Sequence, residues 1–250
     1  SALADQAAIA LEKTHLDEIG EFRERLIGIV GHDLRNPLST ILMAAQILLQ
    51  RERLGEKETE LARKITRAAS LAARLVDQLL DLTMSRLGGG IPIDPKPFDM
   101  NEVCRQVVDE TELTHPDRPL RVDVQGDLTG VWDRDRLYQL FANLVGNAVQ
   151  HGEPRSPIDL RIEGAATEVV IEVANRGEPI APETLPFIFD AFRQGRRARP
   201  FQSHGLGLGL FIAQQITRSH GGSIAVTSSE SDGTTFRVRL PRGAAAAPAG

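Results

Sequence analysis

A short stretch rich in glycine and proline divides the chain into two parts of different character. Residues 88–97 read Gly-Gly-Gly-Ile-Pro-Ile-Asp-Pro-Lys-Pro, a composition that stops any helix. The part before this stretch contains a single proline and few strand formers, whereas β-branched runs alternate with helical patterns after it. The sequence therefore predicts two domains, 1–87 and 98–242, joined by a linker at 88–97 and followed by a disordered Ala/Pro/Gly tail at 243–250.

The first domain is predicted to be a hairpin of two long helices that turns at Gly55. Apolar residues recur at spacings of three and four in each helix, which is typical of packed helices. The two series are Ile27, Val30, Leu34, Leu38, Ile41, Ala45 and Leu48, and then Leu61, Ile65, Ala68, Ala72, Leu75, Leu79 and Leu82. One hairpin buries little, but two copies packed as a four-helix bundle bury both stripes, so we expect a homodimer.

The second domain shows the order α-β-β-α-β-β-α-β-β. Asp99, followed by Glu102, is expected to cap one helix, and Asp133 to cap a second that runs to about residue 150. A third helix is expected over 209–219. Of the six strands in this order, five have predicted bounds, 120–125, 158–163, 169–174, 223–228 and 235–240, and the second has none. This order predicts an α/β sandwich with a mixed sheet and helices on one face.

Composition excludes several classes of function. The 250 residues carry a formal net charge of -5, so there is no basic footprint for nucleic acid. The longest apolar run, 41–49, is broken by Gln46 and falls well short of the roughly 18 apolar residues that a membrane span needs. The single cysteine, Cys104, cannot form an internal disulfide, which fits a cytoplasmic location. Because the chain begins with Ser rather than Met, we interpret it as a fragment.

The first segment that can carry chemistry runs from Gly31 to Leu38 and reads Gly-His-Asp-Leu-Arg-Asn-Pro-Leu. His32 precedes the stripe residue Leu34 by two positions, so it points about 160° away from the stripe and toward solvent. An exposed imidazole beside the carboxylate of Asp33 can act as a nucleophile with its own base. A solvated helical histidine is the alternative interpretation of His32 taken alone.

Two asparagines in the second domain share one face of a predicted helix. Asn143 and Asn147 are four residues apart in the segment Asn-Leu-Val-Gly-Asn-Ala-Val-Gln-His-Gly. Side-chain carbonyl groups on one face can hold a hydrated Mg²⁺, which prefers oxygen ligands and keeps its waters. A pair of surface amides is the alternative.

Two glycine segments follow. Asn175 ends a predicted strand before the turn at Gly177, an arrangement that can present an acceptor to a base, although a plain strand-to-loop turn fits as well. The run Gly-Leu-Gly-Leu-Gly-Leu at 205–210 opens a helix, whose N-terminus favours phosphate. Four arginines within 193–199 precede it, either as a mobile phosphate lid or as a solvated loop.

Together and in this order, these segments resemble the sequence boxes of the sensor histidine kinases of two-component systems. The corresponding boxes are His32–Leu38, Asn143–His151, Asn175–Ile180, Phe189–Phe192 and Gly205–Leu210, with Gly233-Thr234 closing the sheet. The resemblance covers nearly the whole chain. It implies a dimerisation and histidine-phosphotransfer hairpin followed by a Bergerat-fold ATP-binding domain, with residues 1–24 as a coiled-coil linker from an upstream sensor domain that this chain lacks.

The resemblance also implies roles in phosphotransfer. His32 would attack the γ-phosphate of ATP, while Asp33 would orient the imidazole ring and take its proton. The phosphoryl group would then pass to an aspartate of a response regulator receiver domain. Asn36 would position water if the protein also dephosphorylates that partner.

In the implied nucleotide site, Asn147 would ligate Mg²⁺ with support from Asn143, and Asn175 would contact the adenine amino group. The other implied contact residues for ATP are Gln150, His151, Gly177, Ile180, Phe192, Arg193, Gly205, Leu206, Gly207, Leu208, Gly209 and Thr234. Catalysis would then rest on positioning and charge neutralisation, as in phosphoryl transfer generally.

Two other functions are compatible with parts of the sequence. The chain has Asn175 where the family usually has Asp, and Gln150 where Lys is common. These differences motivate a pseudokinase, a dimeric signalling scaffold with a weakened nucleotide site. A related ATPase, or a kinase of the anti-sigma type that phosphorylates serine, is a further alternative, but it has no need of a hairpin with His32.

Overall fold

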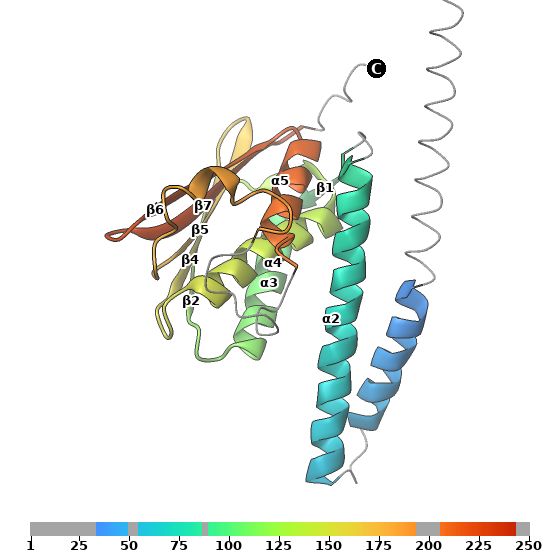
Figure 1. The fold of residues 1–250 in the computed structure, drawn as a ribbon. Helices are drawn as coiled ribbons and strands as arrows, with labels where there is room; N and C mark the ends of the chain where they lie inside the picture. Colours follow the sequence, from blue (N-terminus) through green and yellow to red (C-terminus); the bar gives the residue numbers. More distant parts are fainter. Residues whose placement is uncertain (1–33, 50–54, 87–89, 194–205, 244–250) are drawn as a thin grey trace, which may run out of the picture. The chain divides into compact units, whose positions relative to one another are not determined.

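The computed structural model describes residues 34–49, 55–86, 90–193 and 206–243 (Figure 1). The chain forms two units, Ser1–Gly89 and Gly90–Gly250. In the first unit, residues 34–49 are helical and a second helix, α2, spans Glu56–Arg86. Gly55 lies at the start of α2, where its carbonyl accepts a hydrogen bond from the Thr59 N–H at 3.0 Å. The helical hairpin is therefore as predicted in its described part.

Most of the buried apolar side chains in the described hairpin are small, Leu82 being the exception, and many large ones remain exposed. Ala45, Ala62 and Ala69 are buried, and Arg35 Nε donates to Asp77 Oδ1 at 2.5 Å across the two helices. The large apolar side chains that remain exposed are Leu34, Ile41, Met43, Ile47, Leu48, Leu61, Ile65 and Leu79. A single chain thus leaves much of the predicted apolar stripes uncovered.

The second unit is an α/β sandwich. Its helices are α3 (Met100–Thr114), α4 (Arg134–His151) and α5 (Gly209–Ser219), with a short 3-10 turn at Leu185–Phe187. Its strands are β1 (Lys96–Asp99), β2 (Leu120–Gly126), β3 (Thr129–Trp132), β4 (Ile158–Gly164), β5 (Glu168–Asn175), β6 (Ser223–Ser229) and β7 (Gly233–Pro241). The main sheet has the order β2-β4-β5-β7-β6, with β2 and β4 parallel and the other pairs antiparallel. The predicted mixed sheet is confirmed.

The three helices lie on one side of this sheet (Figure 1), as the alternation of the strands requires. In β4, Ile158, Leu160 and Ile162 are buried, whereas Asp159 and Arg161 between them are exposed. The largest buried side chains of the unit include Trp132, Phe141 and Phe236. The outer face of the sheet is charged and open to solvent.

Strand β1 was not predicted, because it lies partly in the proline-rich stretch. It pairs with β3 in a separate two-stranded sheet. Proline has no N–H to donate, and Pro97 is tolerated because β1 is an edge strand of this sheet. The residues just before β1 are hydrogen-bonded to the helical layer of the same unit. Ser219 Oγ donates to the Ile91 carbonyl at 2.8 Å, and the Asp94 N–H donates to Asp133 Oδ2 at 2.8 Å.

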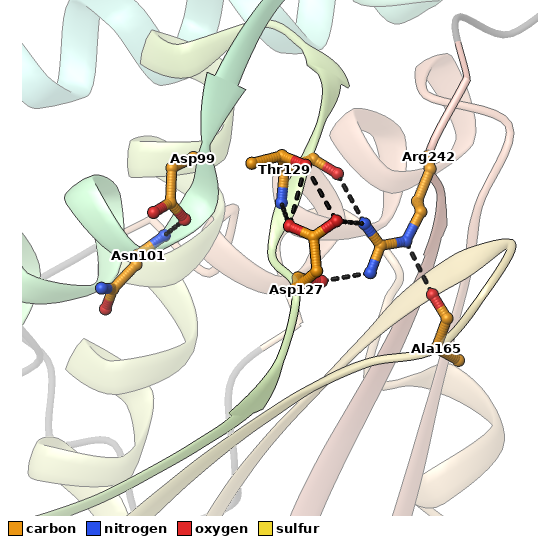
Figure 2. Close-up of polar contacts among 6 residues, drawn as sticks. All are labelled: Asp99, Asn101, Asp127, Thr129, Ala165 and Arg242. Carbon is orange, nitrogen blue, oxygen red and sulfur yellow. Dashed lines mark hydrogen bonds and ion pairs between the residues drawn. The ribbon is translucent and has the colours of Figure 1, made fainter.

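Arg242 joins three segments at one end of the sheet (Figure 2). Its guanidinium group donates to the Ala165 carbonyl at 2.7 Å, to the Thr129 carbonyl at 2.8 Å, and to both the carboxylate and the carbonyl of Asp127. Hydrogen bonds from the Thr129 backbone and hydroxyl, together with Arg242, hold the pKa of Asp127 below its usual value. Figure 2 also shows Asp99, whose side chain caps α3 by accepting from the Asn101 N–H at 2.9 Å.

Candidate functional site

Helix α4 carries the asparagine pair. Asp133 caps its N-terminus and accepts from the N–H groups of Asp135 and Arg136 at 3.0 and 3.1 Å. The helix buries an apolar face that leaves Asn143 and Asn147 half-buried, one turn apart. Gln150 and His151 lie exposed at its C-terminal end.

Asn143 faces the start of α5. A Cβ atom at Gly209 would lie 3.4 Å from Asn143 Oδ1, so the two elements approach closely there. The buried Nδ2 of Asn143 has no hydrogen-bond partner among the described residues. A buried donor without a partner is costly, and a polar ligand would satisfy it. The N-terminus of α5 also has no side-chain cap, so its N–H groups can serve an anion.

Asn175 ends β5 in a small polar network. Its side chain is buried, and Nδ2 donates to the Arg176 carbonyl at 3.3 Å. Thr234 on β7 is its partner across the sheet, and the Thr234 and Ser228 hydroxyls lie 2.7 Å apart. Ser228 Oγ in turn accepts from the Ile180 N–H at 2.9 Å. Strand pairing thus places Asn175 opposite Thr234, and the Ser228 hydroxyl links Thr234 to the Ile180 N–H. Sequence reasoning missed Ser228 because nothing marks one serine in a serine-rich strand.

The end of α4 meets the turn after β5 by direct backbone contact. A Cβ atom at Gly177 would lie 2.7 Å from the His151 carbonyl oxygen, and one at Gly152 would lie 3.4 Å from Asn175 Cβ. A recess of about 520 Å³ opens beside this contact. Its lining residues are His151, Gly152, Glu153, Pro154, Arg176, Gly177, Glu178, Glu230 and Gly233.

The residues that flank the segment 194–205 lie side by side. The Phe192 N–H donates to the Gly207 carbonyl at 3.1 Å, and Gly207 has a φ of +71°, a conformation that favours glycine. The Arg193 guanidinium lies 5.0 Å from the Phe187 ring centroid and 3.8 Å from the Asp190 carboxylate. Leu206 is half-buried and Leu208 is buried at the start of α5.

Several predicted residues lie outside the described part of the chain. His32, Asp33, Gly205 and the arginines at 196–199 are in this group. Asn36 is described: it lies exposed on the helix 34–49, and its carbonyl accepts from Thr40 Oγ1 at 3.0 Å.

The described residues contain no group of three or more His, Cys, Asp or Glu side chains that could hold a metal ion. The oxygen donors at this site are instead the amides of Asn143 and Asn147. Neutral amides fit Mg²⁺ when most of its ligands are water and phosphate, so these two residues suit a metal that arrives with a nucleotide. None of the helices in the described ranges is long and apolar enough to cross a membrane.

A mixed sheet with helices on one face, an asparagine-bearing helix and an uncapped glycine-flanked helix N-terminus fit a nucleotide-binding domain, here preceded by a helical hairpin. Comparison with known families identifies both parts. Residues 132–244 match the family of histidine kinase-, DNA gyrase B- and HSP90-like ATPases. Residues 22–88 match the His Kinase A (phospho-acceptor) domain.

Individual relatives agree with these matches. The chain is 35% identical over 227 residues to a bacteriophytochrome of Pseudomonas aeruginosa, covering 91% of this chain and 31% of that protein. It is 31% identical to the sensor protein CzcS of Cupriavidus metallidurans, covering 88% of this chain and 46% of that protein. The chain therefore spans less than half the length of these two relatives.

Solved structures agree as well. Full-length ShkA in complex with AMPPNP matches over 90% of this chain and 47% of that chain, at 25% identity and a TM-score of 0.68. The histidine kinase ThkA, in complex with the response regulator protein TrrA, matches over 92% of this chain and 64% of that chain, at 26% identity and a TM-score of 0.55. The chain belongs to the sensor histidine kinases of two-component systems and comprises their catalytic core.

Proposed function

We propose that this chain is an ATP-dependent protein histidine kinase that phosphorylates itself on His32. An imidazole nitrogen attacks the γ-phosphorus of ATP, and the N–P bond forms as the P–O bond to the leaving ADP breaks. Asp33 orients the ring and takes the proton that the imidazole releases. The observation that carries the proposal is the unpartnered, buried Nδ2 of Asn143 beside the start of α5, where a bound nucleotide supplies the missing acceptor.

The nucleotide lies along the edge of the second unit formed by α4, the turn after β5 and the start of α5. Asn175 receives the adenine amino group, and Gly205, Gly207 and Gly209 leave room for the phosphates at the start of α5. Asn147 would hold Mg²⁺ with support from Asn143, and a bound ion would supply charge neutralisation at the phosphates. The remaining contacts with ATP come from the other residues that the first subsection names for the nucleotide site.

The proposed partners follow from both domains. Two copies of the hairpin pair through their exposed apolar stripes as a homodimer. The phosphoryl group then passes from His32 to an aspartate of a response regulator, and Asn36 serves a phosphatase step by positioning water. The sensor domain precedes this segment in the full protein, and the segment works in the cytoplasm without contacting nucleic acid or membrane.

Labelling with ATP that carries a radioactive γ-phosphate tests this proposal. The parent chain should acquire label that acid removes, because phosphohistidine is acid-labile and phosphoserine is not. His32→Ala should abolish the label while ATP affinity and dimerisation persist, and His15→Ala should keep it as the matched control. Acid-stable label would instead indicate a serine kinase, label that survives in His32→Ala would refute His32, and no label in a chain that binds ATP would indicate a pseudokinase.

A further inference from the structure

Arg118 holds the C-terminal end of α4 from outside the helix. It lies in the loop between α3 and β2, and its Nη2 donates to the carbonyls of Val149 and Gly152 at 2.7 and 2.8 Å. Its Nη1 donates to the Glu153 carbonyl. The last carbonyls of a helix lack partners within it and carry negative partial charge. Because the last turn of α4 contains no Lys or Arg, only His151, Arg118 supplies the positive charge and the donors there.

The turn that Arg118 holds is also one wall of the candidate nucleotide site. The Glu153 N–H donates to the Arg176 carbonyl at 2.6 Å, directly after Asn175. A Cβ atom at Gly177 would lie 2.7 Å from the His151 carbonyl oxygen and 3.3 Å from the Glu153 nitrogen. These contacts join backbone to backbone, so no side chain between them can adjust. A displacement of residues 151–153 therefore shifts the segment 175–177 as well.

The loop that carries Arg118 is itself fixed to the sheet. The Arg118 N–H donates to the His115 carbonyl at 2.9 Å, and the next residue, Pro119, accepts from the Ile158 N–H at 3.0 Å. The guanidinium therefore projects from an anchored loop, at the start of both β2 and β4, toward the end of α4. A side chain placed in this way can set the position of the turn at 151–153.

We propose that Arg118 is a positioning residue of the nucleotide site. It holds the turn at 151–153 against the segment 175–177 and so keeps His151 and Asn175 in place for the base, without contacting the nucleotide itself. This role rests on the proposed function, which places ATP at this edge. The planar guanidinium serves three carbonyls at once, whereas the compact ammonium of lysine cannot reproduce that fork. Arg118→Lys should therefore retain only part of the effect.

Arg242 offers a matched control. It too serves backbone carbonyls with one guanidinium, but it does so next to Ala165, before β5 begins (Figure 2). Asn175 lies at the other end of β5. The two sites are separated by the length of that strand, about 25 Å. Arg242→Ala should destabilise the same unit without touching the nucleotide edge.

The experiment compares the full chain with its Arg118→Ala, Arg118→Lys and Arg242→Ala variants. Calorimetric titration with a non-hydrolysable ATP analogue and Mg²⁺ should show affinity about tenfold weaker in Arg118→Ala, an intermediate loss in Arg118→Lys and less than about twofold change in Arg242→Ala. The KM for ATP in self-phosphorylation should rise in Arg118→Ala while the maximal rate is retained. Hydrogen exchange of the Glu153 amide should accelerate in Arg118→Ala and not in Arg242→Ala.

Unchanged affinity in Arg118→Ala would overturn the role, as would an equal loss in Arg242→Ala, because affinity would then follow overall stability. If Arg118→Ala does not fold, Arg118→Lys decides the question by the same two criteria. A parent chain that binds no nucleotide would refute the nucleotide site and this role together. Parent binding with an unaffected Arg118 variant would refute the role alone.

Discussion

At the scale of single residues, Asn175 shows how one amide sets what the site can select. Its Nδ2 is engaged with the Arg176 carbonyl, so Oδ1 is the atom that it can offer to an adenine amino group. An amide can also rotate and present its donor to the carbonyl of guanine, which a carboxylate repels. Because the Asn175 side chain is buried, its hydrogen bond to either base would form largely out of contact with water.

Asn175→Asp should therefore tighten ATP binding and weaken GTP binding. A charge-assisted hydrogen bond is roughly twice as strong as a neutral one, which corresponds to about 1 kcal/mol, or several-fold in affinity. The free variant should also unfold more easily, because its carboxylate replaces a donor that faces the Arg176 carbonyl. Calorimetric affinities for both nucleotides in both proteins provide the measurement, and unchanged values for both would mean that Asn175 does not touch the base.

His220 makes the second unit sensitive to pH. The ring is buried, its Nε2 accepts from the Asp133 N–H at 3.0 Å, and Nδ1 therefore carries the proton toward the Ile216 carbonyl at 2.8 Å. Burial lowers the pKa of His220 from 6.5, and Arg136 lowers it further, against the raising effects of the Ile216 carbonyl and Asp133. The unfolded chain thus binds a proton more readily than the folded one, so stability is complete above about pH 6.5 and declines as pH falls toward the lower folded pKa.

The variant His220→Gln should flatten this dependence. Glutamine retains an acceptor and a donor but does not titrate, so the free energy of unfolding should fall less between about pH 7.5 and about pH 5.5 than in the parent. Urea unfolding at both values measures the difference. Partial desolvation also lowers the pKa of His151, an exposed residue. Both proteins contain His151, so its effect on the pH dependence is the same in parent and variant. Parallel pH profiles in parent and variant would show that His220 is not the titrating group.

At the scale of elements, the outer face of the sheet carries a row of alternating charges. Asp123, Arg161, Glu172 and Arg237 are neighbours in register across β2, β4, β5 and β7. Arg161 pairs with Asp123 at 3.2 Å, and Arg237 pairs with Glu172 at 2.5 Å. Opposite charges on facing residues stabilise a sheet, and like charges destabilise it.

Glu172→Lys should place three positive charges side by side and lower the free energy of unfolding by about 1 kcal/mol, whereas Glu172→Gln should cost about half as much. Because these groups are partly exposed, salt should screen the repulsion. The loss in Glu172→Lys should therefore be smaller at about 500 mM than at about 20 mM salt. An equal loss at both salt concentrations would indicate a packing defect in place of electrostatic repulsion.

The elements that sequence predicts well are those with a strict period. Strand β4 alternates buried and exposed residues without a break, and Asp133 marks the start of α4 by its side chain alone. Strand β1 escapes prediction because prolines mask it and because its pairing with β3 is a tertiary event. The role of Arg118 cannot be predicted from the sequence for a similar reason. An arginine in a loop acquires such a role only when folding brings it to carbonyls more than 30 residues away along the chain. Local patterns specify elements, but contacts between distant segments complete the site.

At the scale of the whole molecule, the hairpin's exposed apolar residues should decide whether the chain is paired. Leu61, Ile65 and Leu79 are 59%, 44% and 45% exposed and follow one stripe of α2. Ile65→Glu should turn the homodimer into a monomer, because burying a carboxylate at the centre of a helical bundle is costly. Light scattering coupled to size exclusion measures the change in mass.

The control is Arg63→Glu, two residues earlier on the same helix and about 160° away from the stripe, which should remain a dimer. ATP affinity should stay within about twofold of the parent in both variants, because the nucleotide edge is built entirely from the second unit. A dimeric Ile65→Glu would place the pairing surface elsewhere. A monomer that also loses ATP would mean that the nucleotide site depends on the pairing of two hairpins.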